Sequence, residues 1–371
     1  MKINSILFLF CVMLLALSCS KDQAPLEIVS LKPPPPPPPP VDPLSGTSWV
    51  NEYGSSFNGP VYTLEPRGTD LFVGGAFTYY GNFYSLFLFS IDANYFNSYP
   101  QSGIIGSRIN SLITYNGWLM GAGAFSDGSG MANCGTWNGT MLAGSIYSMG
   151  GVINTAMVHN NEVYVGGGFT VYNSIFYNYV AKHDGVSYLP MGSGFNNPVR
   201  ALAVYNNEVY ACGDFTMSGS TFVNHIAKWN GTSWDPIGTG LNGNAYCLAV
   251  YNNELYVGGV FTQAGSTSRP YIARWNGSYW DGAGIGMSGC VYGVKSLSVI
   301  NNYLIAGGDF SQAGTILTNS IAKWDGTNWY SMGAYLSSNT YMVNDICLFN
   351  NKLYIACGLG PSQGWLLTLS P

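Results

Sequence analysis

Histidines and carboxylates are the side chains from which this chain could build an acid–base or metal site. The sequence has 18 Asp and Glu residues and three histidines, at His159, His183 and His225. A metal site needs ligands that converge on one point, and glycoside hydrolysis needs two carboxylates at a defined separation. The histidines occupy unrelated positions of the internal repeat, and the repeat brings no carboxylate pair together. We therefore predict no catalytic residue, no metal site and no cofactor.

The N-terminal residues predict export and lipid attachment. Lys2 precedes an apolar run over residues 6–17, which is too short to span a bilayer but suits the core of a signal peptide. The segment Leu15-Ala16-Leu17-Ser18-Cys19 resembles a bacterial lipobox. This resemblance implies a signal peptide over 1–18 and acylation of Cys19. The protein would then be an outer-membrane lipoprotein on the cell surface or the periplasmic face, held to the membrane by the lipid. An ordinary secretory signal is the alternative.

Residues 19–45 are predicted to form a tether. Eight consecutive prolines occupy positions 33–40, and a polyproline II run of that length is a stiff rod of roughly 25 Å. Its position between an anchor and a folded body favours a spacer, and a ligand for a proline-recognition domain is the alternative.

Charge is sparse throughout the chain. Only 8% of residues are charged, with 13 Lys and Arg and a formal net charge of −5. No basic stripe exists that would hold a phosphate backbone, so we expect no nucleic-acid partner. Hydrophobic residues make up 47% of the chain, which is enough to form a large core.

Six cysteines follow the predicted lipid anchor. An even number in an oxidising compartment permits disulfides, but four of the six replace Gly, Ala or Ser of neighbouring repeats. That favours small buried thiols, and the disulfide alternative stays open. The six are Cys134, Cys212, Cys247, Cys290, Cys347 and Cys357.

Residues 46–371 repeat with a period near fifty. Each unit reads as four short strands, for example 200–205, 208–213, 226–229 and one around Trp234, and the first two are joined by an Asn-Asn pair suited to a tight hairpin. No stretch has the 3.6-residue rhythm of an amphipathic helix. One recurring position holds Phe77, Phe125, Phe169, Phe215, Phe261, Phe310 and Leu359, at intervals of 48, 44, 46, 46, 49 and 49 residues.

The two ends of the repeat region complement each other. Residues 46–49 copy residues 231–234, which belong to a fourth strand, whereas the last unit ends after three strands. We therefore predict an all-β, seven-bladed β-propeller of four-stranded antiparallel blades. Its ring is closed by residues 47–52 pairing with residues 365–370, which removes two open sheet edges. We expect this propeller to be monomeric.

The repeat resembles known propeller families. A Gly-Gly pair that ends the second strand, followed by an aromatic residue and a Trp on the next two strands, resembles kelch-type repeats. The phrase Tyr-Asn-Asn-Glu-Leu-Tyr-Val-Gly-Gly-Val-Phe-Thr at 251–262 is closer to the repeats of cortical polarity-marker proteins and many secreted bacterial proteins. The resemblance covers 46–371 and implies the fold but no activity, because propellers host binding and catalysis alike.

Departures from the repeat mark a candidate binding face. The loops between the second and third strands of the first and third units are rich in aromatic residues, and the first strand of every unit begins at the same face. Such rings, with amides and cations, could bind a sugar or a protein loop; packing between blades is the alternative. The candidates are Tyr62, Tyr79, Tyr80, Phe83, Tyr84, Tyr172, Phe176, Tyr177, Tyr179, Arg200, Tyr246 and Lys295, with Asn110, Asn154 and Asn344 in the layer of Tyr62.

These observations together predict a cell-envelope lipoprotein whose propeller is a non-catalytic recognition module for a glycan or a protein. A structural or envelope-assembly scaffold is the first alternative, and a carbohydrate-active enzyme is a more distant one.

Overall fold

The computed structural model describes residues 42–46, 48–51, 56–92, 96–98, 105–126, 132–137, 142–143, 149–333, 342–358 and 363–370. The chain divides into two compact units, 1–40 and 41–371, and all described residues belong to the second. The predicted signal peptide, Cys19 and the proline run lie outside the described residues. Within the described part, no helix has the length and apolarity to cross a membrane.

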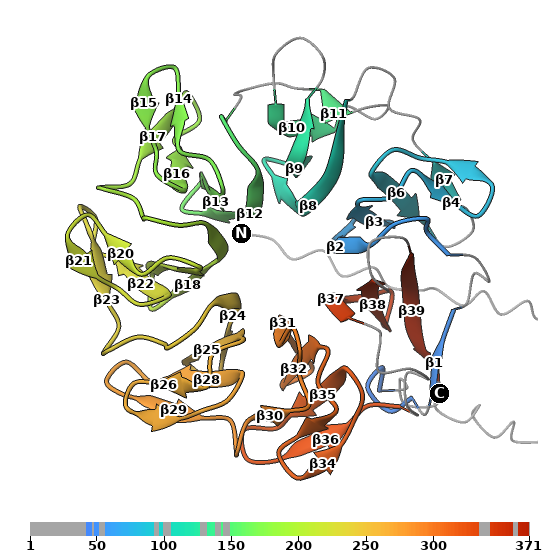
Figure 1. The fold of residues 1–371 in the computed structure, drawn as a ribbon. Coiled ribbons are helices and arrows are strands. Elements are labelled where there is room, and N and C mark those ends of the chain that lie inside the picture. The colour runs from blue at the N-terminus through green and yellow to red at the C-terminus, as the bar shows by residue number, and fades with distance from the viewer. Residues whose placement is uncertain are drawn as a thin grey trace, which may run out of the picture. The chain divides into compact units, whose positions relative to one another are not determined.

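Strands of the described residues form seven four-stranded antiparallel sheets around a common centre (Figure 1). The fold is a β-propeller. We number the blades 1 to 7 in the order of their inner strands. The strands of each blade are given from inner to outer. Blade 1 contains β2 (Val61–Arg67), β3 (Asp70–Gly75), β6 (Leu88–Ile91) and β7 (Phe96–Ser98). Blade 2 contains β8 (Ile105–Tyr115), β9 (Trp118–Ser126), β10 (Ala132–Trp137) and β11 (Leu142–Ala143), and blade 3 contains β12 (Ile153–His159), β13 (Glu162–Gly167), β16 (Val180–His183) and β17 (Tyr188–Pro190). Blade 4 contains β18 (Val199–Tyr205), β19 (Glu208–Gly213), β22 (Ile226–Trp229) and β23 (Trp234–Pro236); blade 5 contains β24 (Ala245–Tyr251), β25 (Glu254–Gly259), β28 (Ile272–Trp275) and β29 (Trp280–Gly282). Blade 6 contains β31 (Val294–Ile300), β32 (Tyr303–Gly308), β35 (Ile321–Trp324) and β36 (Trp329–Ser331), and blade 7 contains β37 (Met342–Phe349), β38 (Lys352–Gly358), β39 (Gly364–Ser370) and β1 (Ser48–Val50).

Short hairpins follow the second strand of several blades. Five are described, and Figure 1 places the labelled ones toward the outer ends of their blades. They are β4 (Tyr79–Tyr80) with β5 (Phe83–Tyr84), β14 (Val171–Tyr172) with β15 (Ile175–Phe176), β20 (Met217–Ser218) with β21 (Thr221–Phe222), β26 (Gln263–Ala264) with β27 (Thr267–Ser268), and β33 (Gln312–Ala313) with β34 (Ile316–Leu317), while β30 (Met287–Ser288) joins β33.

The Asn-Asn pairs make the tight turns that join inner strands to second strands. Asn206 and Asn207 have φ angles of 49° and 62°, and Tyr205 pairs with Glu208 across the turn. Asn tolerates this left-handed conformation, which a two-residue hairpin with the twist of a β-sheet requires. The strands that the sequence predicts at 208–213 and 226–229 are confirmed, because β19 and β22 have these limits.

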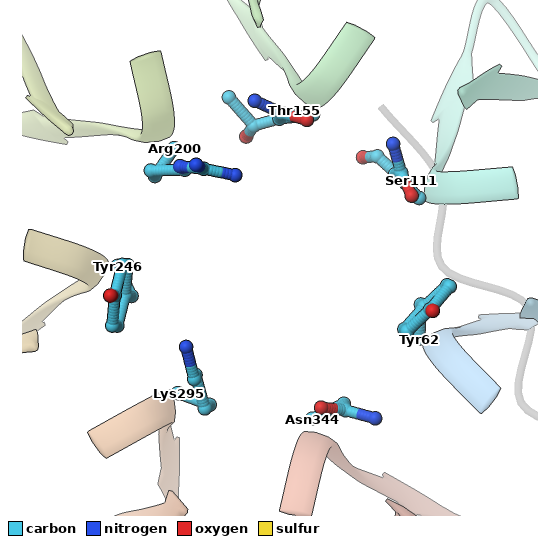
Figure 2. A pocket seen from close by; sticks show the side chains of 9 residues that line it. Tyr62, Ser111, Thr155, Arg200, Tyr246, Lys295 and Asn344 are labelled. Atoms are coloured by element: carbon cyan, nitrogen blue, oxygen red, sulfur yellow. The ribbon is translucent and has the colours of Figure 1, made fainter. Parts of the chain in front are cut away.

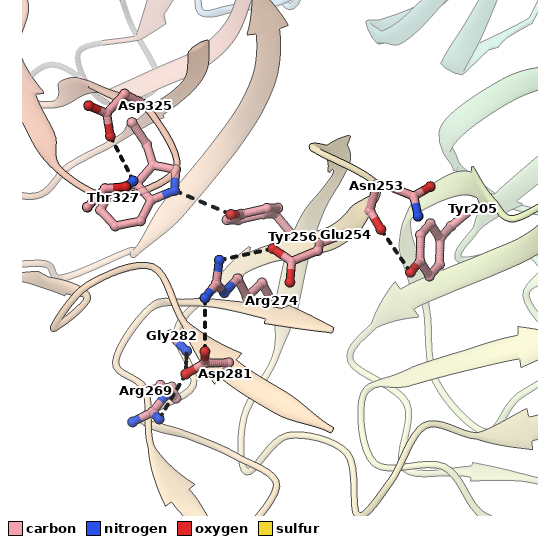
Figure 3. Close-up of polar contacts among 11 residues, drawn as sticks. Tyr205, Asn253, Glu254, Tyr256, Arg269, Arg274, Asp281, Gly282, Asp325 and Thr327 are labelled. Carbon is pink, nitrogen blue, oxygen red and sulfur yellow. Dashed lines mark hydrogen bonds and ion pairs between the residues drawn. The ribbon is translucent and has the colours of Figure 1, made fainter. Parts of the chain in front are cut away.

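The hydrophobic core lies between adjacent blades. One buried cluster, for example, joins Val180 of blade 3 to Phe215 and Trp234 of blade 4. Polar groups also cross the same boundaries: the Tyr205 hydroxyl of blade 4 donates to the Asn253 carbonyl of blade 5 at 3.1 Å (Figure 3). The recurring aromatic residues of the repeat fill these interfaces, and Phe77, Phe125, Phe169, Phe215, Phe261 and Phe310 are all buried.

A tryptophan on the outer strand ties each of blades 4, 5 and 6 to the preceding blade. The Trp234 indole N–H donates to the Met191 carbonyl at 3.2 Å, and Trp280 and Trp329 repeat this contact on Ile237 and Ala283. This bond adds direction to an otherwise apolar interface, because a buried indole N–H needs an acceptor.

The two ends of the chain share blade 7. Strand β1 pairs antiparallel with β39, with Trp49 opposite Leu369 and Val50 opposite Thr368. The Trp49 indole donates to the Met332 carbonyl at 2.9 Å, the same contact that Trp234 makes between blades 3 and 4. The predicted segment 47–52 thus pairs with β39 through residues 48–50, whereas residues 47 and 52 lie outside the described residues.

The inner strands are continuous across the junction of blades 7 and 1. Strand β37 contacts β2 just as the other inner strands contact their neighbours. The Asn344 side chain donates to the Val61 carbonyl at 2.8 Å, and the Leu64 N–H donates to the Asp345 carboxylate at 2.8 Å. These bonds join the first and last inner strands of the propeller.

The packed body begins before the predicted boundary at residue 46. Leu44 is buried among Met332, Ile346 and Leu369, and its carbonyl accepts a hydrogen bond from Lys323 at 3.1 Å. Residues near the end of the predicted tether therefore pack against blades 6 and 7.

Candidate functional site

Each inner strand carries a β-bulge close to its start. In blade 4, Val199 pairs with Gly213 and Ala201 with Cys212, so that Arg200 has no opposite residue in β19. A bulge re-aims the side chain of the extra residue, and here it turns that side chain toward the centre of the propeller. One bulged residue of each blade belongs to this layer, and β8 has a further bulge at Ser107. The seven residues of the layer are Tyr62, Asn110, Asn154, Arg200, Tyr246, Lys295 and Asn344.

Glycine at the end of the second strand makes room for this bulge. A Cβ atom at Gly213 would lie 2.3 Å from the Pro198 carbonyl oxygen, and one at Gly259 would lie 2.2 Å from the Asn244 carbonyl oxygen. Both distances are far shorter than a van der Waals contact. The recurring glycine is therefore needed where the chain enters the inner strand in blades 1 to 6, whereas blade 7 has Cys357 at this position.

The bulged residues surround a central cavity of about 370 Å³ (Figure 2). The structure brings the whole predicted layer together, one residue from each blade. It adds Ser111 and Thr155, which the sequence analysis did not include. Each directly follows a bulged asparagine in its strand, and the order Asn-Ser or Asn-Thr is the signal that could have marked them. Whether the cavity binds a ligand remains a prediction.

Three asparagines of the ring hold neighbouring blades together. The Asn110 side chain donates to the Ile153 carbonyl at 2.8 Å, and Asn154 donates to the Val199 carbonyl at 2.9 Å. Asn344 makes the same contact between blades 7 and 1. The amide groups in blades 2, 3 and 7 therefore have a structural role, and the side-chain oxygen of Asn110 also accepts the Arg108 Nε–H at 3.0 Å.

Blades 4, 5 and 6 depart from this pattern. Arg200, Tyr246 and Lys295 lie side by side on one side of the cavity (Figure 2). The Lys295 amino group lies 3.5 Å from the centre of the Tyr246 ring, which is a cation–π distance. Arg200 pairs instead with Asp214 of its own blade, through bonds of 3.1 Å from Nε and a shorter contact from Nη2.

Burial and neighbouring charges shift the pKa values of Lys295, Arg200 and Tyr246. Burial lowers the pKa of Lys295 to about 8, and the nearby Arg200 charge acts in the same direction. The hydrogen-bonded Asp214 carboxylate holds the pKa of Arg200 above its usual range. Burial raises the pKa of Tyr246. Lys295 is thus charged at neutral pH but loses its proton more readily than an ordinary lysine.

Two of the predicted aromatic site residues are core residues, so the prediction was wrong for them. Tyr80 is 4% exposed and packs on Phe57 at 4.7 Å between ring centres, and Tyr177 is 4% exposed in the cluster between blades 2 and 3. The reason is the alternation of side chains along a strand: Tyr79 faces solvent and Tyr80 faces the blade. The positions equivalent to Tyr80 in blades 5 and 6 are Ala264 and Ala313, which are fully buried.

The other hairpin aromatics are more accessible but lie away from the cavity. Tyr79, Tyr84 and Phe176 are 44%, 43% and 68% exposed, and Tyr172 is partly buried against the core. Their hairpins lie toward the outer ends of the blades, whereas the bulged residues lie at the centre (Figure 1). Phe83 is exposed like Tyr84, and Tyr179 is partly buried. The structure therefore separates the predicted site into a central group and an outer group.

Histidines and cysteines do not gather into a site in the described part of the chain. His183 is buried, and its Nδ1 accepts the Gly185 N–H at 3.1 Å. No group of three His, Cys, Asp or Glu residues placed to hold a metal ion occurs among the described residues. The six described cysteines are free thiols, and burial raises the pKa of Cys247 to about 12.

Comparisons with known proteins support the fold. No family model matches the chain, and no curated protein matches it at a significant level. Among solved structures, it is similar to a chain of the mitotic checkpoint complex (TM-score 0.55, 11% identity, 98% of this chain and 99% of that chain). It is also similar to the designed Ika8 protein (0.52, 12%, 84% and 97%) and to the Dos1 propeller (0.51, 12%, 87% and 95%). At such identities the likeness concerns the β-propeller fold alone.

Proposed function

We propose that this protein is a non-catalytic recognition module whose ligand, a glycan or a protein segment, enters the central cavity. The cavity volume of about 370 Å³ is at the lower end of the range of ligand sites. Its lining combines two tyrosine rings with cations, amides and hydroxyls, which are the groups that fix the orientation of a polar ligand. The kelch-like character of the repeat belongs to this proposal as well.

The observation that carries the proposal is the change of chemistry within the ring. Asparagine is sufficient to bridge neighbouring blades in blades 2, 3 and 7. Arg200, Tyr246 and Lys295 occupy the same bulged position and make no such bridge to the next blade among the described contacts. Their polar groups make no hydrogen bond to a carbonyl of the next blade in the described residues, although Lys295 contacts the Tyr246 ring of the preceding blade, so these long side chains are available for a ligand.

A binding role is supported over catalysis by the state of the nearby carboxylates. Asp214 is paired with Arg200, and one oxygen of Asp309 accepts the N–H groups of Val291 and Tyr292 at 2.8 and 2.7 Å. Asp214 is thus held by Arg200 and one oxygen of Asp309 by the backbone, while the buried Oδ1 of Asp309 has no hydrogen-bond partner among the described residues. Neither carboxylate is paired with the second carboxylate that acid–base hydrolysis uses.

Recognition at the cell envelope is the second part of the proposal. It rests on the lipobox-like residues that end at Cys19, with the tether over residues 19–45 placing the propeller away from the membrane. We expect Cys19→Ala to abolish incorporation of labelled fatty acid and to release the protein from the membrane fraction. Retention of the variant in membranes would overturn the anchor assignment.

A glycan array with the full chain tests the cavity proposal. The test variant combines Tyr62→Ala, Tyr246→Ala and Lys295→Gln, and Phe176→Ala on the outer hairpin is its control. We expect glycan binding by the wild type and the control, and its loss in the cavity variant at unchanged melting temperature. Binding that survives in the cavity variant would contradict the proposed site.

A scaffold without a dedicated ligand is the second candidate. The asparagine bridges favour it, because they show that part of the ring serves the fold. If the protein is a scaffold, the melting temperature of the cavity variant should be several degrees lower than that of the wild type. If it is a recognition module, the two melting temperatures should be the same.

A further inference from the structure

Lys295 is the cation of the central cavity that forms no ion pair with a described carboxylate; elsewhere Arg108 and Lys323 also form none. Lys182, Lys228, Arg200, Arg269 and Arg274 each lie within 4 Å of a carboxylate. Figure 3 shows Arg274 between Glu254 and Asp281, with Arg269 on the other side of Asp281. No described carboxylate lies that close to Lys295.

The carboxylate nearest in register to Lys295, Asp309, is engaged elsewhere through one oxygen only, and its buried Oδ1 has no hydrogen-bond partner among the described residues. Asp309 follows the second strand of blade 6 just as Asp214 follows that of blade 4, where it binds the bulged Arg200. In blade 6, an oxygen of Asp309 accepts two backbone N–H groups of the incoming loop instead. The Lys295 amino group therefore lies over the Tyr246 ring, at the cavity and without an anionic partner.

The charge around the cavity is more positive than that of the chain. The chain has a formal net charge of −5 with only 13 basic residues. Two of these residues, Lys295 and Arg200, line the cavity, and Arg108 lies next to it, with its Nε donating to the Asn110 side chain at 3.0 Å. Asp214 and Asp309 are the nearby carboxylates. Three cations and two carboxylates leave a formal charge of +1 around the ring, and with Asp214 bound to Arg200 this positive charge is available to an anion.

We propose that the cavity binds an acidic saccharide, with the carboxylate of a uronic acid residue held by Lys295 and Arg200. This inference rests on the proposed recognition function and names its ligand class. A hydrogen-bonded pair between a cation and a carboxylate is stronger than one between neutral groups. A free Lys295 provides such a pair without first breaking an ion pair.

The remainder of the ring suits sugar hydroxyls better than an acidic peptide. Ser111 accepts the Ala156 N–H and keeps its own proton for donation. The side-chain oxygens of Asn154 and Asn344 are acceptors at the cavity, since their amide nitrogens bind backbone carbonyls. The Tyr62 and Tyr246 rings offer faces on which a pyranose ring can pack.

Calorimetric titration of the full chain in mild detergent tests the proposal, with trigalacturonic acid and its methyl ester as probes. The two probes have the same rings and hydroxyls and differ in charge. We expect the acid to bind about tenfold more tightly than the ester, as a charge-assisted hydrogen bond predicts. The preference should weaken with added salt.

Substitutions at Lys295 test whether this side chain causes the preference for the acid over the ester. Lys295→Gln should bring the affinity for the acid down to that for the ester, whereas Lys295→Arg should retain it. Lys352→Gln is the matched control, because it removes the same charge at the start of β38 in blade 7, and Lys352 does not line the cavity. Wild-type affinity for the acid should fall as the pH rises past 8, and Lys295→Arg should keep its affinity to higher pH. Melting curves verify that each variant is folded.

Each contrary outcome overturns a defined part of the proposal. Equal affinity for acid and ester, both lost in Tyr62→Ala, would leave the cavity as a recognition site and overturn the anion assignment. Tighter binding of an acetylated triglutamate peptide would overturn the saccharide assignment. No binding of any probe would overturn the inference itself. The glycan array tests the proposed function separately, because it scores the binding of neutral as well as acidic glycans.

Discussion

Asp345 is a carboxylate placed at the junction between the last and the first inner strand. It accepts the Leu64 N–H across the junction and the Ile346 N–H of its own strand, both at 2.8 Å. Burial raises its pKa to about 7, and the charge of Glu65 on the neighbouring strand acts in the same direction. Cys347 also faces this group, and burial raises its pKa as well.

The sign of the resulting pH dependence follows from proton linkage. The pKa of Asp345 is higher in the folded than in the unfolded chain, so the folded state binds the proton more tightly. This contribution to stability is present below about pH 4 and is lost as the pH rises through 7. Asp345→Asn keeps an acceptor for Leu64 and does not titrate. We expect urea unfolding to show the variant gaining roughly 2 kcal/mol on the wild type between pH 5 and pH 8. A constant difference would contradict the raised pKa.

At this scale, the sequence predicted which residues face the centre but not which aromatics are buried. The bulged position could be found because its chemistry varies from Tyr62 to Arg200 while its neighbours repeat. Tyr80 and Tyr177 were misassigned because their burial depends on how a two-residue hairpin folds back on its blade. Aligning Tyr80 with Ala264 and Ala313 would have indicated a buried position.

The hairpins give a prediction at the scale of elements. Tyr80→Ala removes a ring packed on Phe57, and Tyr177→Ala removes one from the cluster between blades 2 and 3. We expect each to lower the free energy of unfolding by about 3 kcal/mol, as for other buried aromatic residues. Tyr84→Ala and Phe176→Ala change exposed rings and should cost less than about 0.5 kcal/mol.

Chemical denaturation of the four hairpin variants distinguishes these classes. Similar losses in all four would mean that the outer hairpins act as one structural unit. A loss confined to Tyr84→Ala and Phe176→Ala would contradict the burial described above.

The outer-strand tryptophans give a second prediction for elements. Trp49 makes the contact to the preceding blade that Trp234, Trp280 and Trp329 make elsewhere. Trp49→Ala should therefore destabilise the propeller by about 3 kcal/mol, which is a large part of the 5–15 kcal/mol of a typical domain. Calorimetric melting measures this loss. An unchanged melting temperature would show that β1 is dispensable.

At the scale of the molecule, the arrangement of the blades could be predicted because it depends on register. The repeat region begins with a single strand of the outer kind and ends with a unit that lacks its outer strand. The first therefore completes the last, and this conclusion does not depend on the identity of their side chains. The ligand could not be predicted in the same way. It depends on a few side chains that depart from the repeat, such as Lys295 and its unpaired amino group, and their partners become evident only when seven distant segments meet.

The account depends on the ring being closed by the two ends of the chain, since an open ring would have no enclosed centre. The most direct test is a disulfide between Ser48→Cys and Ser370→Cys, which lie opposite each other in β1 and β39. A pair of Ser48→Cys with Ser331→Cys, at the end of β36 in blade 6, is the control. We expect mild oxidation to crosslink only the first pair, as detected by mass spectrometry of tryptic peptides, and to raise the melting temperature. Failure of the 48–370 pair to crosslink in the folded protein, or equal crosslinking of the control pair, would contradict the closed propeller.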